Sequence, residues 1–202
     1  MIKAQAVKLF GRWNYEEIII EDEGLKSVIT INPIIYPKTG GRLANTHYGK
    51  AKINIVERLI NRMFVAGHKG KKHKLTSGIN TGKTLKNIKN VIEAFEIIEK
   101  RLKKNPLQVL VKAIENAAPV EEVITYQKGG IIAREAVVIS PLRRVDLALR
   151  HLVGGAYLKR HANSKSAGEI LANEIILAYN DDPESFAILE KNRREKEAEG
   201  AR

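Results

Sequence analysis

The side chains best suited to chemistry are three arginines in one short stretch: Arg143, Arg144 and Arg150. The preceding Ser140 and Pro141 are typical of a helix N-cap and a first helical residue, and apolar residues then recur at helical spacing. A helix buried on one side holds such guanidinium groups in fixed positions, where their planar forks suit bidentate phosphate contacts. A solvated charged face is the commoner explanation for an isolated helix, so the rest of the chain has to decide.

The positive charge of the chain is concentrated in two segments. The chain has 202 residues and a formal net charge of +12. Residues 24–92 contain 14 basic side chains against a single acid, Glu57, and residues 140–165 contain 6 against Asp146 alone. Such local excess is typical of a surface that binds nucleic acid. A membrane surface also attracts basic segments, but these lack the amphipathic pattern of an interfacial helix.

Two glycine-containing basic segments precede the arginine helix. Lys38 to Arg42 (KTGGR) is predicted to be a turn whose glycines let the backbone approach a phosphate, although an ordinary surface turn is equally consistent with it. Residues 67–82 are predicted to be a solvent-exposed loop. The basic residues of that loop and its end join the candidate RNA contacts: Lys69, Lys71, Lys72, Lys74 and Lys83.

The apolar pattern predicts a mainly α fold of about six helices, with one β-hairpin protruding between the third and fourth. Gly129-Gly130 separates two β-branched runs, which favours a tight hairpin turn. Lys128 and Arg134 are predicted to lie near its tip. We expect a single hairpin to lean on helices at one end, because it is not stable alone.

The chain divides by pattern into three parts. Residues 1–48 are predicted to form an extended arm with short strands, at 17–20 and 29–32. Residues 49–182 are predicted to form the helical core, including the hairpin at about 120–139. The last part, 183–202, is predicted to be a helix beginning near Asp182-Pro183, followed by a charged tail that frays.

The sequence offers no catalytic site, metal site or cofactor-binding motif. Gly82-Lys83-Thr84 resembles the end of a phosphate-binding P-loop, but Ser77 stands where that motif needs its first glycine and no buried strand precedes it. His68 and His73 lack metal-ligand spacing. There is no cysteine, which fits a cytoplasmic protein, and no apolar run is long enough to span a membrane.

Several long stretches resemble the universal small-subunit ribosomal protein family numbered seven in bacteria and five in eukaryotes, in its archaeal form. They are Gly49-Lys50-Ala51 with IVERLIN, the run NPLQVLVKAIENAAPVEEV, Lys128-Gly129-Gly130 and ISPLRRVDLALR. The resemblance extends from His47 to about Tyr179. The front segment LFGRWNY and the turn PKTGGR resemble the extension of archaeal and eukaryotic members.

This resemblance implies a non-catalytic protein that binds the 3′ major domain of small-subunit ribosomal RNA and nucleates assembly of the subunit head. It implies neighbouring ribosomal proteins as partners, and a hairpin close to the exit-site transfer RNA and the messenger RNA. Arg143, Arg144 and Arg150 match the family's arginines after the hairpin. Lys128, Gly129 and Gly130 match its hairpin tip, and Lys50 and Lys52 match its basic entry to the first helix.

An alternative hypothesis is an architectural or regulatory DNA-binding protein that places the Ser140 helix in a major groove. A hairpin directly before that helix argues against a helix-turn-helix, which needs a helix and a short turn there. Only 5% of the residues are aromatic. Recognition is therefore expected to depend on shape and phosphate contacts rather than on base stacking from strands.

Overall fold

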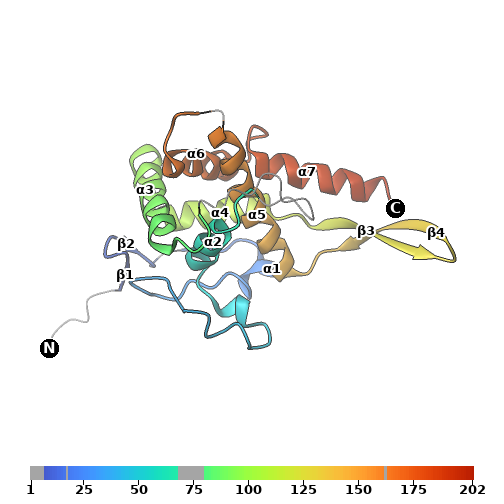
Figure 1. Cartoon of the computed structure of the whole chain (residues 1–202), viewed down its shortest axis with the longest axis horizontal. Coiled ribbons are helices and arrows are strands. Elements are labelled where there is room, and N and C mark those ends of the chain that lie inside the picture. Colours follow the sequence, from blue (N-terminus) through green and yellow to red (C-terminus); the bar gives the residue numbers. More distant parts are fainter. Residues whose placement is uncertain (1–6, 17, 68–79, 162) are drawn as a thin grey trace.

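The structure, a computed structural model, describes residues 7–16, 18–67, 80–161 and 163–202, with the backbone alone at Lys128 and His161 (Figure 1). It confirms a mainly α fold. The helices are α1 Glu23–Lys26, a 3₁₀ helix Gly49–Lys52, α2 Ile55–Met63, α3 Thr84–Leu102, α4 Pro106–Ala117, α5 Pro141–His161, α6 Ala167–Tyr179 and α7 Phe186–Glu199. The strands are β1 Lys8–Leu9, β2 Trp13–Asn14, β3 Glu121–Lys128 and β4 Ile131–Val138. In the described chain, α2 to α7 are the six long helices.

Short polar side chains begin several of these helices. Asn54 accepts a hydrogen bond from the Val56 N–H at 2.9 Å, and Asn105 accepts one from the Leu107 N–H at 3.0 Å. Each bond satisfies a backbone donor that has no partner inside its helix. The helix boundaries are therefore local consequences of the sequence.

Helix α5 is the centre of the helical body, because it contacts α1, α2, α4, α6 and α7. Its inward residues, such as Leu152, are fully buried with Phe95 of α3 and Leu110 of α4. Gly155 allows the closest approach: a Cβ atom there would lie 2.7 Å from Cβ of Phe186 and 2.9 Å from Oε1 of Glu174. The buried Glu174 also accepts a hydrogen bond from the Ser185 hydroxyl at 2.8 Å. The start of α7 is thereby fixed against α5 and α6.

The predicted hairpin forms between α4 and α5 and projects from one end of the helical body (Figure 1). Its strands are antiparallel, with Lys128 opposite Ile131 at the tip and Glu121 opposite Val138 at the base. Gly129 and Gly130 have φ of +57° and +85°. Two successive positive φ angles are the reason that glycine is needed at both positions.

The N-terminal segment differs in detail from its prediction. The strand predicted at 29–32 is reduced to a single bridge between Thr30 and Asn54, residues 18–20 form no strand, and Glu17 lies outside the described residues. The strands that do form are β1 and β2, before both. Leu9, Trp13 and Leu25 are buried in the main core, so apolar contact with the helices holds this segment in place.

The prediction of a fraying C-terminal tail is wrong. The last helix begins at Phe186, four residues after Asp182, and continues to Glu199. Its end packs beside the base of the hairpin, where Arg202 forms an ion pair with Glu121 and Ala198 is fully buried. These contacts come from a hairpin far away in the sequence, which explains why the charged composition of the tail was misleading.

Candidate nucleic-acid interface

The basic residues predicted to contact RNA lie on several exposed segments. Lys38 and Arg42 are exposed in a turn that α2 holds, since Glu57 accepts hydrogen bonds from the Thr39 N–H and hydroxyl, both at 2.8 Å. Further exposed members of the set lie on the 3₁₀ helix, before α3 and on β4: Lys50, Lys52, Lys83 and Arg134. Lys69, Lys71, Lys72 and Lys74 lie outside the described residues, as does the side chain of Lys128.

The two arginines at the start of α5 are engaged within the protein. Arg143 forms a bidentate ion pair with Glu122 of β3, with Nε–Oε1 and Nη2–Oε2 distances of 2.5 and 2.8 Å. Arg144 donates to Oδ2 of Asp22 at 2.8 Å and to the Pro119 carbonyl at 3.2 Å. Arg144 therefore joins α5 to the N-terminal segment and to the start of the hairpin. Their contact with RNA stays a prediction.

A second internal network lies beside the first turn of α2. Asp146 of α5 accepts from Arg58 at 3.0 Å and from Lys50 at 2.6 Å. The Arg58 side chain is almost fully buried and also donates to the Val28 carbonyl at 3.1 Å. Burial lowers the pKa of Arg58, and the hydrogen bond with Asp146 opposes that shift. This network fixes α2 against α5 and leaves Lys50 at the surface.

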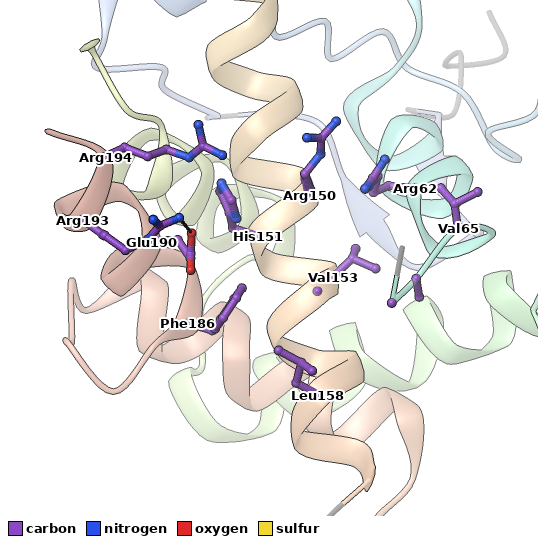
Figure 2. A pocket seen from close by; sticks show the side chains of 13 residues that line it. Arg62, Val65, Arg150, His151, Val153, Leu158, Phe186, Glu190, Arg193 and Arg194 are labelled. Carbon is purple, nitrogen blue, oxygen red and sulfur yellow. Dashed lines mark hydrogen bonds and ion pairs between the residues drawn. The ribbon is translucent and has the colours of Figure 1, made fainter. Parts of the chain in front are cut away.

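Four other arginines line a cavity between α2, α5 and α7: Arg193, which binds Glu190, and the three arginines Arg62, Arg150 and Arg194 (Figure 2). The cavity has a volume of about 400 Å³. Within the described chain, Arg62 and Arg150 have no ion pair, and the one carboxylate within 4 Å of Arg194 is Glu122, at 3.5 Å. A neighbouring hollow of about 220 Å³ shares Arg62 and Arg150 and is also lined by Lys50. Arg62 and Arg150 are thus the two cations of this face without an ion pair in the described chain, although Asp146 lines the neighbouring hollow and its charge acts on Arg62.

Burial is the main cause of the pKa shifts on this face; nearby arginine charges add to it, and the charges of Asp146 and Glu190 oppose it. Burial, followed by the nearby charge of Arg150, lowers the pKa of Arg62. His151, which is only 5% exposed, has its pKa lowered to about 4 by burial first and then by the charge of Arg194. Its imidazole is therefore neutral at pH 7 and adds no charge of its own.

Sequence reasoning identified only one of these three arginines. Arg150 belongs to the predicted arginine helix, whereas Arg62 was placed in a helix with no assigned role and Arg194 in a tail expected to fray. A fully buried Ala187 and Ala198 bracket Arg194 on α7. These two alanines are the weak indication in the sequence that one side of this charged helix is buried.

The described residues contain neither a metal centre nor a helix that could cross a membrane. Among them, no three histidine or acidic side chains gather where they could hold a metal ion. No helix in the same ranges is both long and apolar enough to cross a bilayer.

Comparison with known proteins gives a consistent result. The family model described as ribosomal protein S7p/S5e matches residues 30–202. A protein of Nanoarchaeum equitans named small ribosomal subunit protein uS7 is 53% identical over 196 residues, which cover 97% of this chain and 99% of that protein. Proteins with the same name from Methanococcus aeolicus and Methanococcus maripaludis are 42% and 40% identical over 197 residues, with the same coverage.

Proposed function

This chain belongs to the ribosomal protein S7p/S5e family, and on that premise we propose that it is a non-catalytic, structural constituent of the small ribosomal subunit that binds ribosomal RNA. Three archaeal relatives named small ribosomal subunit protein uS7 match it over nearly their whole length. This similarity supports a structural role in the ribosome and therefore a location in the cytoplasm.

The observation that carries the RNA-binding proposal is the gathering of Arg62, Arg150 and Arg194 around one cavity. Like charges held together raise the free energy of the folded protein unless something neutralises them. Glu122 lies 3.5 Å from Arg194 and the charge of Asp146 acts on Arg62, but Arg62 and Arg150 have no ion pair among the described residues. Phosphates spaced along an RNA strand supply the missing negative charge, and guanidinium groups bind them in a bidentate manner.

We infer that the RNA is the 3′ major domain of small-subunit ribosomal RNA and that binding nucleates assembly of the subunit head. The long matching stretches from Asn105 to Val123 and from Ile139 to Arg150 support this inference. The hairpin projects from the body with exposed Gly129 and Gly130 at its tip, whereas the exposed Arg134 pairs with Thr125, about halfway along the hairpin rather than near its tip as predicted. This shape supports a position near the exit-site transfer RNA and the messenger RNA.

Binding to a transcript of the 3′ major domain, measured over a series of salt concentrations, tests the proposal. The logarithm of the affinity should fall steeply with the logarithm of the salt concentration, by roughly 0.7 to 0.9 for each phosphate neutralised. Matched titrations with random duplex DNA and with a transcript of another ribosomal domain give the control. A flat salt response, or equal affinity for all three nucleic acids, contradicts specific recognition of this domain.

A further inference from the structure

The cavity between α2, α5 and α7 has two chemically different ends (Figure 2). Arg62, Arg150 and Arg194 lie toward one end, while Phe186 and Leu158 lie toward the other. A carboxylate, Glu190, also lines the cavity, but Arg193 binds it at 2.7 Å. The cavity therefore offers cations and an apolar wall within one volume of about 400 Å³.

Two neighbouring rings form part of the wall between these ends. The ring of His151 is tilted against that of Phe186, with centroids 6.2 Å apart. His151 is almost fully buried and Phe186 is half-buried, so Phe186 is the ring that a ligand can contact. A ligand with a flat apolar face would pack against it.

We propose that this cavity receives a single unstacked nucleotide of the bound RNA. Its phosphate lies against Arg62, Arg150 and Arg194, and its base lies against Phe186 and Leu158. The inference rests on the proposed function and deepens it, because it states which part of the RNA enters the protein.

The cationic end and the apolar end of the cavity together fit a whole nucleotide better than a phosphate or a base alone. In a continuous duplex the bases are stacked and paired. A phosphate of such a duplex could bind the arginines, but no base would contact the apolar end of the cavity. Bases that leave the stack at bulges and loops are the ones that proteins recognise by aromatic contact and hydrogen bonds to their edges. The cavity volume lies in the range of sites that enclose small organic ligands.

Filling the cavity without removing a contact residue is the sharpest test, and Gly154 allows it. Gly154 lines the cavity, and a Cβ atom there would meet Cε1 of Phe186 at an ordinary 3.8 Å. Leucine also has a much higher helix propensity than glycine. Gly154→Leu should therefore fold, with a melting temperature at least equal to that of the wild type, while its side chain occupies the space for the base.

The matched control is Gly200→Leu at the end of α7. Gly200 is exposed, has an ordinary φ of −73°, and a Cβ atom there would lie 3.6 Å from the nearest atom, the Lys196 carbonyl oxygen, so the same change places a leucine outside the cavity. RNA affinity should fall roughly ten- to a hundredfold in Gly154→Leu, the range of one lost base contact, and should not change in Gly200→Leu.

Base-specific chemical modification of the 3′ major domain transcript identifies the nucleotide. The wild-type protein should protect one unpaired base that becomes reactive again with Gly154→Leu, while the other protections persist. Unchanged affinity and unchanged reactivity at every base would overturn the proposal, as would uniform loss of all protections by a folded variant. Failure of the wild-type protein to bind the transcript would instead contradict the proposed function.

Discussion

Helix α5 carries arginines in two different situations, at its start and near its middle. Arg144 at the start binds Asp22 and the Pro119 carbonyl. Arg150, six residues later, has no ion pair among the described residues and faces Arg62 across two adjoining hollows. The same residue type on the same helix therefore supports the fold in one place and leaves a positive charge available in the other.

The difference arises from the segments that pack beside each part of the helix. The N-terminal segment and the hairpin bring Asp22 and Glu122 to the start of α5. Near its middle, α2 and α7 contribute Arg62 and Arg194 instead, and Glu190 of α7 is already bound to Arg193. Charge on this helix is thus assigned by tertiary neighbours rather than by the helix itself.

The largest expected effect comes from neutralising three of the arginines that line the cavity. Changing Arg62, Arg150 and Arg194 together to glutamine should weaken binding of the 3′ major domain transcript roughly a hundredfold or more, because three charge-assisted phosphate contacts are lost. The salt slope should fall by roughly 2. The melting temperature of the free protein should not decrease, since the change relieves repulsion.

The matched control changes three exposed lysines of α3 and its C-cap to glutamine: Lys89, Lys100 and Lys103. It lowers the net charge by the same amount. Equal losses of affinity in the two triple variants, measured by filter binding at 0.15 M salt, would show that total charge matters and its arrangement does not.

The pH dependence of stability sharpens the same comparison, because His151 lies within the positive cluster. Its folded pKa of about 4 is below the ordinary value of 6.5, so between these values the unfolded chain binds a proton that the folded chain does not. The free energy of unfolding should therefore be highest above pH 6.5 and fall as the pH drops toward 4. The loss attributable to His151 should be roughly 2 kcal/mol by pH 5.

Urea denaturation of the wild type and His151→Gln at pH 5, 6 and 7 measures this contribution. The variant should show a shallower dependence on pH than the wild type. An unchanged slope in His151→Gln would mean that the imidazole is accessible to protons in the folded state. Arg150, Arg193, Arg194 and Glu190 are the charges that act on it.

At the start of α5 the expected loss is in stability rather than in binding. Arg144→Ala leaves Asp22 and the Pro119 carbonyl without their partner, and the Arg144 side chain is only 14% exposed. The free energy of unfolding should fall by about 1 to 2 kcal/mol, the cost of unsatisfied, partly buried polar groups. RNA affinity per folded molecule should stay close to that of the wild type.

Its neighbour provides the control for this change. Arg143 is 53% exposed, and Arg143→Ala should reduce stability by at most about 0.5 kcal/mol, as for other exposed ion pairs. The sequence predicts both arginines as RNA contacts. A fall in affinity at unchanged melting temperature, in either variant, would support that prediction against the structural role.

Much of the fold could be predicted from local patterns. The hairpin follows from Gly129-Gly130 between two β-branched runs, and the starts of α2 and α4 follow from Asn54 and Asn105, because turns and caps depend on residues a few positions apart. The start of the C-terminal helix could also be predicted, but its continuation to Glu199 could not. Its buried side consists of little more than Ala187, Ile188 and Ala198, and its end packs beside a hairpin that its own sequence does not indicate.

The site was less predictable than the fold, because it depends on which charges find partners. The pattern predicted a basic surface and placed Arg150 on a helix, which the structure confirms, while its contact with RNA stays a prediction. It could not show that Arg144 binds an aspartate 122 positions away, or that Arg62 and Arg194 approach Arg150 from two other helices. Composition predicts how much charge a chain carries, and tertiary contacts decide where that charge is available.

Glu122 contacts an arginine at the start of α5 and also one of the cavity arginines, and its substitution should have the smallest effect on RNA affinity. Glu122 binds Arg143 and also lies 3.5 Å from Arg194, so it partly neutralises the cluster. Glu122→Gln should raise RNA affinity by roughly two- to threefold by releasing Arg194, at a stability cost below about 1 kcal/mol. Glu121→Gln is the matched control, because it adds the same charge while its carboxylate pairs with Arg202 instead. If both variants gain equally, the effect is one of net charge, whereas a gain confined to Glu122→Gln means that Glu122 controls how much of the cluster is available to RNA.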